Sequence, residues 1–265
     1  MTFFRFEFKR QLSYTLIWAT VVVGLLWMLI NGFYPIFLES KAAVSDMLSA
    51  FPQGMAAAFG FNLDDLFSYE SFSGMVYLYE GILGAIMAAG TAISVFAREK
   101  QCKCLDFILT KPQSRAKIFW QKLLCCILLI TLFNLPYLSL FTANYLHYNS
   151  GGLSNVMLLS MLCLFFTQLV FFAFGLFAAV FMRKIRSASG LSSGIGLFAF
   201  LLSMVYSLTE KDIFKFISPL YYFSPNAVTS TGGYDLPCVI TAVALIIGLT
   251  AASFFKYTRA DVPVL

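Results

Sequence analysis

The sequence predicts an all-α membrane protein of six transmembrane helices, with both termini in the cytoplasm and a short helix between the second and third spans. Three observations lead to this fold class. Of the 265 residues, 60% are hydrophobic and only 12% are charged, whereas soluble domains carry roughly 25% charged residues. Apolar runs of about 20 residues, the length that crosses a bilayer as a helix, recur along the chain. The basic residues lie in alternate segments between these runs.

Six long apolar runs together cover about half of the chain. They are continuous rather than alternating, which excludes a membrane β-barrel. The first run is longer than the core of a signal peptide and lacks a small-residue cleavage site, so we expect a true span there. The expected spans of this single transmembrane domain are residues 15–37, 75–97, 123–146, 156–182, 188–208 and 237–255.

The positive charges predict how these spans are oriented. If the N-terminus lies inside, residues 1–14, 98–122, 183–187 and 256–265 face the cytoplasm and hold 15 of the 18 Lys and Arg residues. Cytoplasmic loops of membrane proteins carry such an excess. The net charge of +5 is therefore explained by basic loops that face anionic membrane lipid, and it requires no nucleic-acid partner.

Two segments on the outer side are long enough to form structure. Residues 38–73 carry apolar side chains at the i, i+3, i+4, i+7 spacing of an amphipathic helix, namely Val44, Met47, Leu48 and Phe51. Pro52 is expected to end this helix. Residues 209–236 contain the run FISPLYYFSP, whose aromatic residues favour the headgroup level. We expect a short re-entrant or interfacial hairpin in this second segment.

The chain lacks the residues that enzymes and metal sites require. It contains one histidine, His147, and no Ser/His/Asp set, zinc-protease helix or phosphate-binding loop of the ATPase type. Cys102 and Cys104 form one C-x-C pair, which supplies only half of a metal site. We therefore expect no catalysis and no bound metal, and any ATP-driven work would need a motor on another chain.

Polar or small residues interrupt four of the spans. Glu80 is the only ionisable residue within the expected spans, and it either reaches the nearby interface or faces a water-filled cavity beside substrate or a neighbouring helix. Gly190 and Gly194 form a G-x-x-x-G motif, which indicates packing within the chain, a subunit contact or a mobile helix. Asn134 and Gln168 are interpreted as packing features.

The segment 98–122 is short, basic and partly amphipathic. Leu105, Ile108 and Leu109 lie at i, i+3 and i+4 and form an apolar stripe. Pro112 must end this helix, and Ser114 is placed to cap the next one. Spacing alone leaves two interpretations open, a helix that docks into a partner and an ordinary positive-inside loop.

The same segment, REKQCKCLDFILTKPQSRAKIFWQK, resembles the loop between the second and third spans in permeases of ABC transporters of the second type. The residues that carry the resemblance are Glu99, Leu105, Ile108, Leu109, Pro112, Ser114, Arg115 and Lys122. The run FPQGMAAAFGF and the basic-aromatic C-terminal end give weaker support. Lys103 and Cys104 stand where members of the family commonly have Gly-Thr, so the start of the helix is expected to differ in shape.

The resemblance implies a multi-pass subunit of the plasma membrane of a bacterium. It implies two permeases, identical copies or paralogues, and two cytoplasmic ABC ATPase subunits that bind Mg–ATP, while this chain binds no cofactor. The coupling helix that receives the ATPase motion would use Glu99, Leu105, Ile108, Leu109, Pro112 and Arg115. The second and fifth spans would flank the pathway, which makes Glu80, Gly190 and Gly194 candidates for pathway or packing residues. The expected cargo is amphipathic or hydrophobic: a peptide, an antibiotic or a lipid.

Other classes of membrane protein remain as alternatives. A secondary transporter or a channel-like protein would work without an ATPase, but its usual signs are coupling carboxylates, broken helices or a repeat, and we find none. A membrane enzyme would need clustered nucleophiles or acids within the spans. A purely structural membrane subunit fits the sequence as well.

Overall fold

The computed structural model describes residues 2–49, 60, 66–98, 114–148, 154–209 and 211–259. Within this part of the chain all regular structure is helical. Six helical stretches are long and apolar enough to cross a membrane, and they confirm the six predicted spans. They are a first stretch that opens with α1 (Thr2–Trp27), then α5 (Tyr69–Phe96), α8 (Arg115–Tyr148), α9 (Asn155–Phe181), α10 (Ala188–Thr209) and α13 (Leu236–Arg259).

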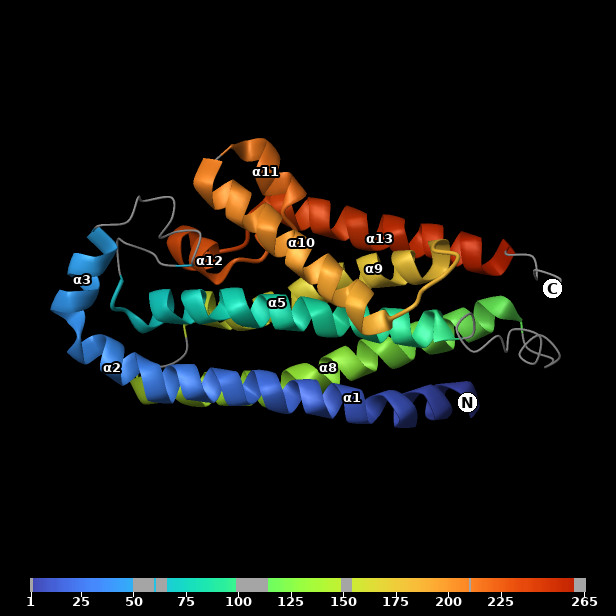
Figure 1. Ribbon diagram of the computed structural model, residues 1–265, viewed down its shortest axis with the longest axis horizontal. Helices are drawn as coiled ribbons and strands as arrows, with labels where there is room; N and C mark the ends of the chain where they lie inside the picture. The colour runs from blue at the N-terminus through green and yellow to red at the C-terminus, as the bar shows by residue number, and fades with distance from the viewer. Residues whose placement is uncertain are drawn as a thin grey trace.

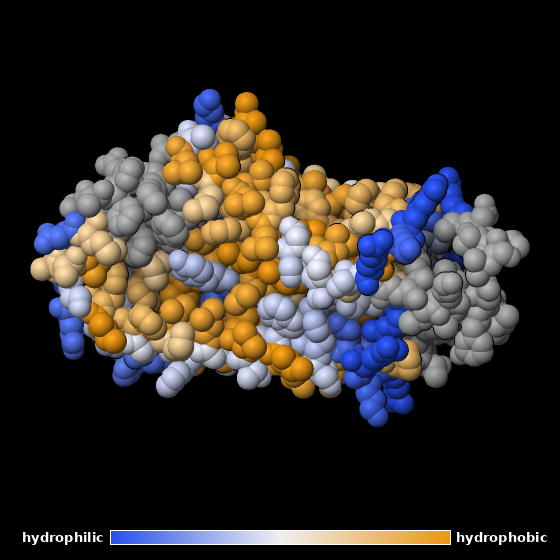
Figure 2. Space-filling model, in the orientation of Figure 1, coloured by the Kyte–Doolittle hydropathy of each residue, from blue (hydrophilic) through white to orange (hydrophobic). Residues whose placement is uncertain are grey.

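The long helices form an elongated bundle, with α10 crossing it obliquely (Figure 1). Both termini lie at one end of the bundle, and α3 and α12 lie at the other end (Figure 1). An even number of spans requires this arrangement of the termini. We call the end with the termini the basic end, because the loop between α9 and α10 also brings Arg183, Lys184 and Arg186 there. Figure 2 shows a hydrophobic surface over the middle of the bundle and hydrophilic side chains toward its ends.

Helical structure continues beyond the apolar run of the first span. After α1 the chain continues through a π-helical turn (Met28–Phe33) into α2 (Tyr34–Glu39) and then α3 (Lys41–Ser49). In the π-helical turn, Asn31 donates a hydrogen bond to Asn144 Oδ1 on α8, at 3.1 Å. The predicted amphipathic helix is present as α3, where Met47 is exposed and Val44 is half-buried. Phe51 and Pro52 lie outside the described residues.

The centre of the bundle is the contact between α5 and α9, the most extensive one in the molecule. A Cβ atom at Gly175 would lie 2.6 Å from the carbonyl oxygen of Ala89, so the two backbones touch at this point. Membrane helices associate through small residues in this way, because lipid supplies no hydrophobic force between them. On α5 a further row of buried small side chains, Ala85, Ala88 and Ala92, continues the contact.

The segment between the fifth and sixth spans, where a short hairpin was expected, packs against the bundle. It forms α11 (Asp212–Ile217), a turn and α12 (Pro225–Thr231), which packs against α9 and α5. Gly232 ends α12 with a φ of 76°, the left-handed conformation that glycine adopts without strain. Two residues of this segment, Phe223 and Val228, are buried.

Candidate functional site

Most of the predicted coupling residues lie outside the described residues. These are Glu99, Leu105, Ile108, Leu109 and Pro112. The structure does describe Arg115, which is half-buried and is the first residue of α8. Ser114 caps this helix as predicted, since its Oγ accepts a hydrogen bond from the backbone N–H of Lys117 at 3.4 Å.

The residue just before this segment is tied to the first helix. Arg98, at the end of α5, forms an ion pair with Glu7 of α1. The Glu7 residue is only 4% exposed, so the pair is largely withdrawn from water. Loss of either partner is expected to destabilise the folded protein strongly, because the remaining charge would stay buried without compensation.

The helix that follows this segment, α8, is tied to α5. Lys122 of α8 is 1% exposed and donates a hydrogen bond from its Nζ to the carbonyl oxygen of Val95, at 3.0 Å. Its ammonium group also lies 5.6 Å from the centre of the Phe96 ring, a cation–π distance. The chain is therefore held to the bundle just before residues 99–113, at Arg98, and again after them, at Lys122 within α8. We refer to Glu7, Arg98, Val95, Phe96 and Lys122 as the anchor cluster.

Sequence reasoning missed the role of Glu7, although the sequence holds a signal for it. Glu7, Gln11 and Thr15 lie four residues apart and are all buried, and the same face of α1 continues with Val22 and Leu26. A polar stripe in register with an apolar stripe indicates that both face the protein rather than lipid or water. The acid therefore faces the bundle, where Arg98 ends α5.

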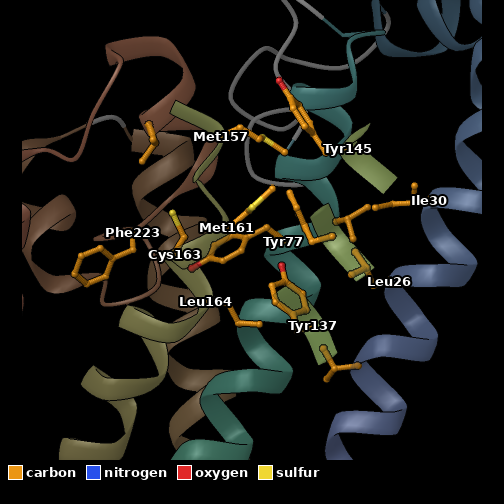
Figure 3. Close-up of a cluster of buried hydrophobic side chains, with 14 of the residues drawn as sticks. Leu26, Ile30, Tyr77, Tyr137, Tyr145, Met157, Met161, Cys163, Leu164 and Phe223 are labelled. Atoms are coloured by element: carbon orange, nitrogen blue, oxygen red, sulfur yellow. The ribbon is translucent and has the colours of Figure 1, made fainter. Parts of the chain in front are cut away.

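Glu80 lies inside the bundle rather than on its surface. It is 0% exposed on α5, and neither carboxylate oxygen has a hydrogen-bond partner among the described residues. Tyr137 of α8 is close enough to interact with it. Figure 3 shows Tyr137 and Tyr77 side by side between the helices, and Tyr77 forms a hydrogen bond with Thr167 of α9, at 2.7 Å. A carboxyl group in such a position is a functional-site candidate because its burial is costly.

Asn134 and Gln168 extend this polar region across the bundle. The two amides are joined by a hydrogen bond from Asn134 Nδ2 to Gln168 Oε1, at 2.5 Å. A Cβ atom at Gly84, one turn beyond Glu80, would lie 3.1 Å from Gln168 Nε2, so Gln168 covers α5 at this point. Asn134 Oδ1 and Gln168 Nε2 have no further partner in the described part of the chain. We call Glu80, Tyr137, Asn134 and Gln168 the polar layer; it joins α5, α8 and α9.

Gly190 and Gly194 do not pack against another helix among the described residues. A Cβ atom at Gly194 would meet nothing within 4 Å, and one at Gly190 would meet only Ser187, which lies at the start of the same helix. Among the described residues nothing supports packing of this motif within the chain, so a subunit contact and a mobile helix remain as its interpretations. Gly196 makes the close contact instead, since its Cβ atom would lie 2.5 Å from Ile86 Cγ1 on α5.

The described residues hold no group of three or more His, Cys, Asp or Glu side chains that could bind a metal ion. The four cysteines among them are free and buried: Cys125, Cys126, Cys163 and Cys238. Cys102 and Cys104 lie outside the described residues.

Comparison with known protein families identifies a match over nearly the whole chain. The family described as "ABC-2 family transporter protein" matches residues 1–262, almost the whole chain. No curated protein matches the chain.

Proposed function

The chain belongs to the ABC-2 transporter family and is a membrane permease subunit of an ABC transporter, and we propose that it forms the substrate pathway of an exporter driven by separate cytoplasmic ATPase subunits. The observation that carries this proposal is the anchor cluster. It ties the chain to the bundle at Arg98, before the segment 99–113, and at Lys122 in α8, after it, so a partner that moves the segment would act on the helices that flank it. Mg–ATP would be bound by that partner and not by this chain. We propose that this chain forms a single domain in the bacterial plasma membrane.

The position of α5 explains how such a movement would spread. α5 is the most buried of the six spans and contacts α1, α9, α10 and α12. A displacement applied at Arg98 and at Lys122 would therefore act on the helix that touches most of the bundle. Cores are close-packed and switch between discrete arrangements rather than deform continuously. ATP binding by the partner would favour one of two such arrangements.

A second permease would complete the pathway. α1, α10 and α13 leave most of their apolar side chains outside the protein, whereas α5 and α9 are mostly buried. On α10 the motif of Gly190 and Gly194 is exposed and open to a neighbour, and such a motif permits close approach of another helix. We therefore propose that α10 faces a second copy or a paralogue of this chain across the pathway.

The proposed cargo is amphipathic or hydrophobic, as a peptide, an antibiotic or a lipid would be. The exposed face of α10 carries three large apolar side chains, those of Leu197, Phe198 and Leu201. A charged cargo would lose its hydration beside them without gaining a polar partner. The polar layer behind this face, on α5, α8 and α9, offers hydrogen-bonding groups that an amphipathic molecule could use if the helices move apart.

Isolation of the chain in mild detergent tests the proposed function. We expect a nucleotide-binding protein to purify with it, and the mass of the particle to match two permeases and two ATPase subunits. The preparation should hydrolyse ATP faster when its cargo is present. A particle that contains this chain alone, with transport unaffected by ATP, would support the alternative of a secondary transporter or channel.

A further inference from the structure

A pocket of about 540 Å³ opens between α11, α12 and the start of α13. This region lies toward the end of the bundle opposite the two termini (Figure 1), and the charge distribution of the chain assigns that end to the outer leaflet. We call this space the outer pocket.

The outer pocket carries one positive and one negative charge. Among the described residues that line it, Lys215 and Asp235 are the only charged ones, and they form an ion pair. Their mutual hydrogen bond raises the pKa of the Lys215 ammonium and lowers the pKa of the Asp235 carboxyl, so both charges persist at neutral pH. Their side chains are 25% and 32% exposed, so the pair can still be reached from outside. An ammonium group has three donors and a carboxylate has about four acceptor positions, so each side chain can also bind a ligand.

Aromatic rings form the fixed walls of the outer pocket. The hydroxyl of Tyr222 donates to the carbonyl oxygen of Phe216, and that of Tyr234 donates to the carbonyl oxygen of Leu159 at 2.6 Å. These bonds hold in place two side chains that line the pocket. Burial raises the pKa of Tyr222 to about 12, so this residue adds no charge at neutral pH. Aromatic faces attract ammonium groups.

An apolar surface leads from the pocket along the outside of the bundle. Leu236 lines the pocket and is 72% exposed, and Ile240, one turn further along α13, is 67% exposed. On α11, Ile213 and Phe216 are exposed as well, and Figure 2 shows a hydrophobic surface where α10 and α11 lie. From the pocket along the bundle, the charged pair is followed by tyrosine rings and then by an apolar helix surface. This order matches that of headgroup, interface and acyl chain in a leaflet.

We propose that the outer pocket binds the headgroup of a zwitterionic phospholipid of the outer leaflet. Lys215 binds its phosphate, Asp235 binds its ammonium group, and the acyl chains lie along Leu236 and Ile240. A purely anionic headgroup would bind Lys215 but lie against the carboxylate of Asp235, and a purely cationic ligand would bind Asp235 but lie against the ammonium group of Lys215. A ligand with both charges satisfies both residues. This inference does not depend on the proposed ATPase partner.

Lipid binding to the purified chain in mild detergent tests the proposal. Native mass spectrometry would count bound phosphatidylethanolamine and phosphatidylglycerol molecules with the same acyl chains. We expect the wild-type chain to retain phosphatidylethanolamine in preference. Asp235→Asn should weaken this binding about tenfold, because a hydrogen bond between charged groups is lost. Lys215→Met should weaken binding of both lipids, since both carry a phosphate.

Lys211→Met is the matched control, because Lys211 is an exposed lysine on the same segment and does not line the pocket. It should leave binding unchanged. Equal retention of the two lipids by the wild-type chain would overturn the proposal, and this comparison changes no residue and so does not depend on the folding of a variant. An Asp235→Asn variant that keeps the full preference would overturn it as well.

Discussion

Replacement of Leu105 and Ile108 by aspartate is expected to release the ATPase from the purified transporter and to abolish ATP-driven transport. The two residues lie three apart on the predicted helix of the segment 99–113, where they form its apolar stripe with Leu109. Two central apolar contacts of an interface contribute about 2 kcal/mol each. Their loss would weaken binding of the ATPase by about 4 kcal/mol, or about a thousandfold. Co-purification and ATP hydrolysis measure the effect.

The control for this variant replaces Lys103 and Asp106 with serine, because these residues lie beside the stripe. The control should keep its ATPase. Both variants should remain monodisperse with unchanged thermal stability, since the segment lies outside the six spans. Unchanged co-purification of the aspartate variant, together with normal ATP-driven transport, would mean that the segment does not dock the ATPase.

Reversal of the charge on Glu7 is expected to produce the largest loss of stability among single changes at the basic end. Glu7→Arg would place a second cation beside Arg98 at a site that is nearly closed to water. Loss of one partner of a buried pair costs about 3–5 kcal/mol. Arg98→Glu should have a similar effect for the same reason. Thermal unfolding of the purified chain in detergent measures both.

The double variant, Glu7→Arg with Arg98→Glu, separates the ion pair from other effects of the two changes. It restores opposite charges across the contact and should recover most of the lost stability. Lys9→Glu is the control, because Lys9 is an exposed basic residue on the same helix. Single variants as stable as the wild type, or a double variant no better than either, would show that the pair does not hold α1 to α5.

The spans were predictable because long apolar runs have few other stable structures. The fifth span was predicted at residues 188–208 and is observed as Ala188–Thr209. The third span was predicted at residues 123–146, and its helix, α8, begins earlier, at Arg115, directly after the predicted cap at Ser114. Hydropathy detects only its apolar part, whereas Ser114 starts the helix by capping it. The π-helical turn in the first span has no comparable signal in the sequence.

The contacts between helices were less predictable, because hydropathy does not reveal how a membrane helix is rotated about its axis. Glu7 and Arg98 are separated by 91 residues, and Asn134 and Gln168 by 34. Their pairing depends on which faces meet when the bundle packs. The same limit explains why Gly194 was a packing candidate, although Gly196 makes the contact with α5.

We propose that the segment 99–113 lies in the cytoplasm and is covered by an ATPase. Cys102 and Cys104 lie within this segment, and the four cysteines of the described residues are buried. A membrane-impermeant maleimide therefore reports on the segment when it is added to sealed vesicles of either orientation, with and without the ATPase. We predict labelling only when the cytoplasmic face is outward, and much slower labelling when the ATPase is bound. Labelling from the outer face, or a rate that the ATPase does not change, would contradict the account.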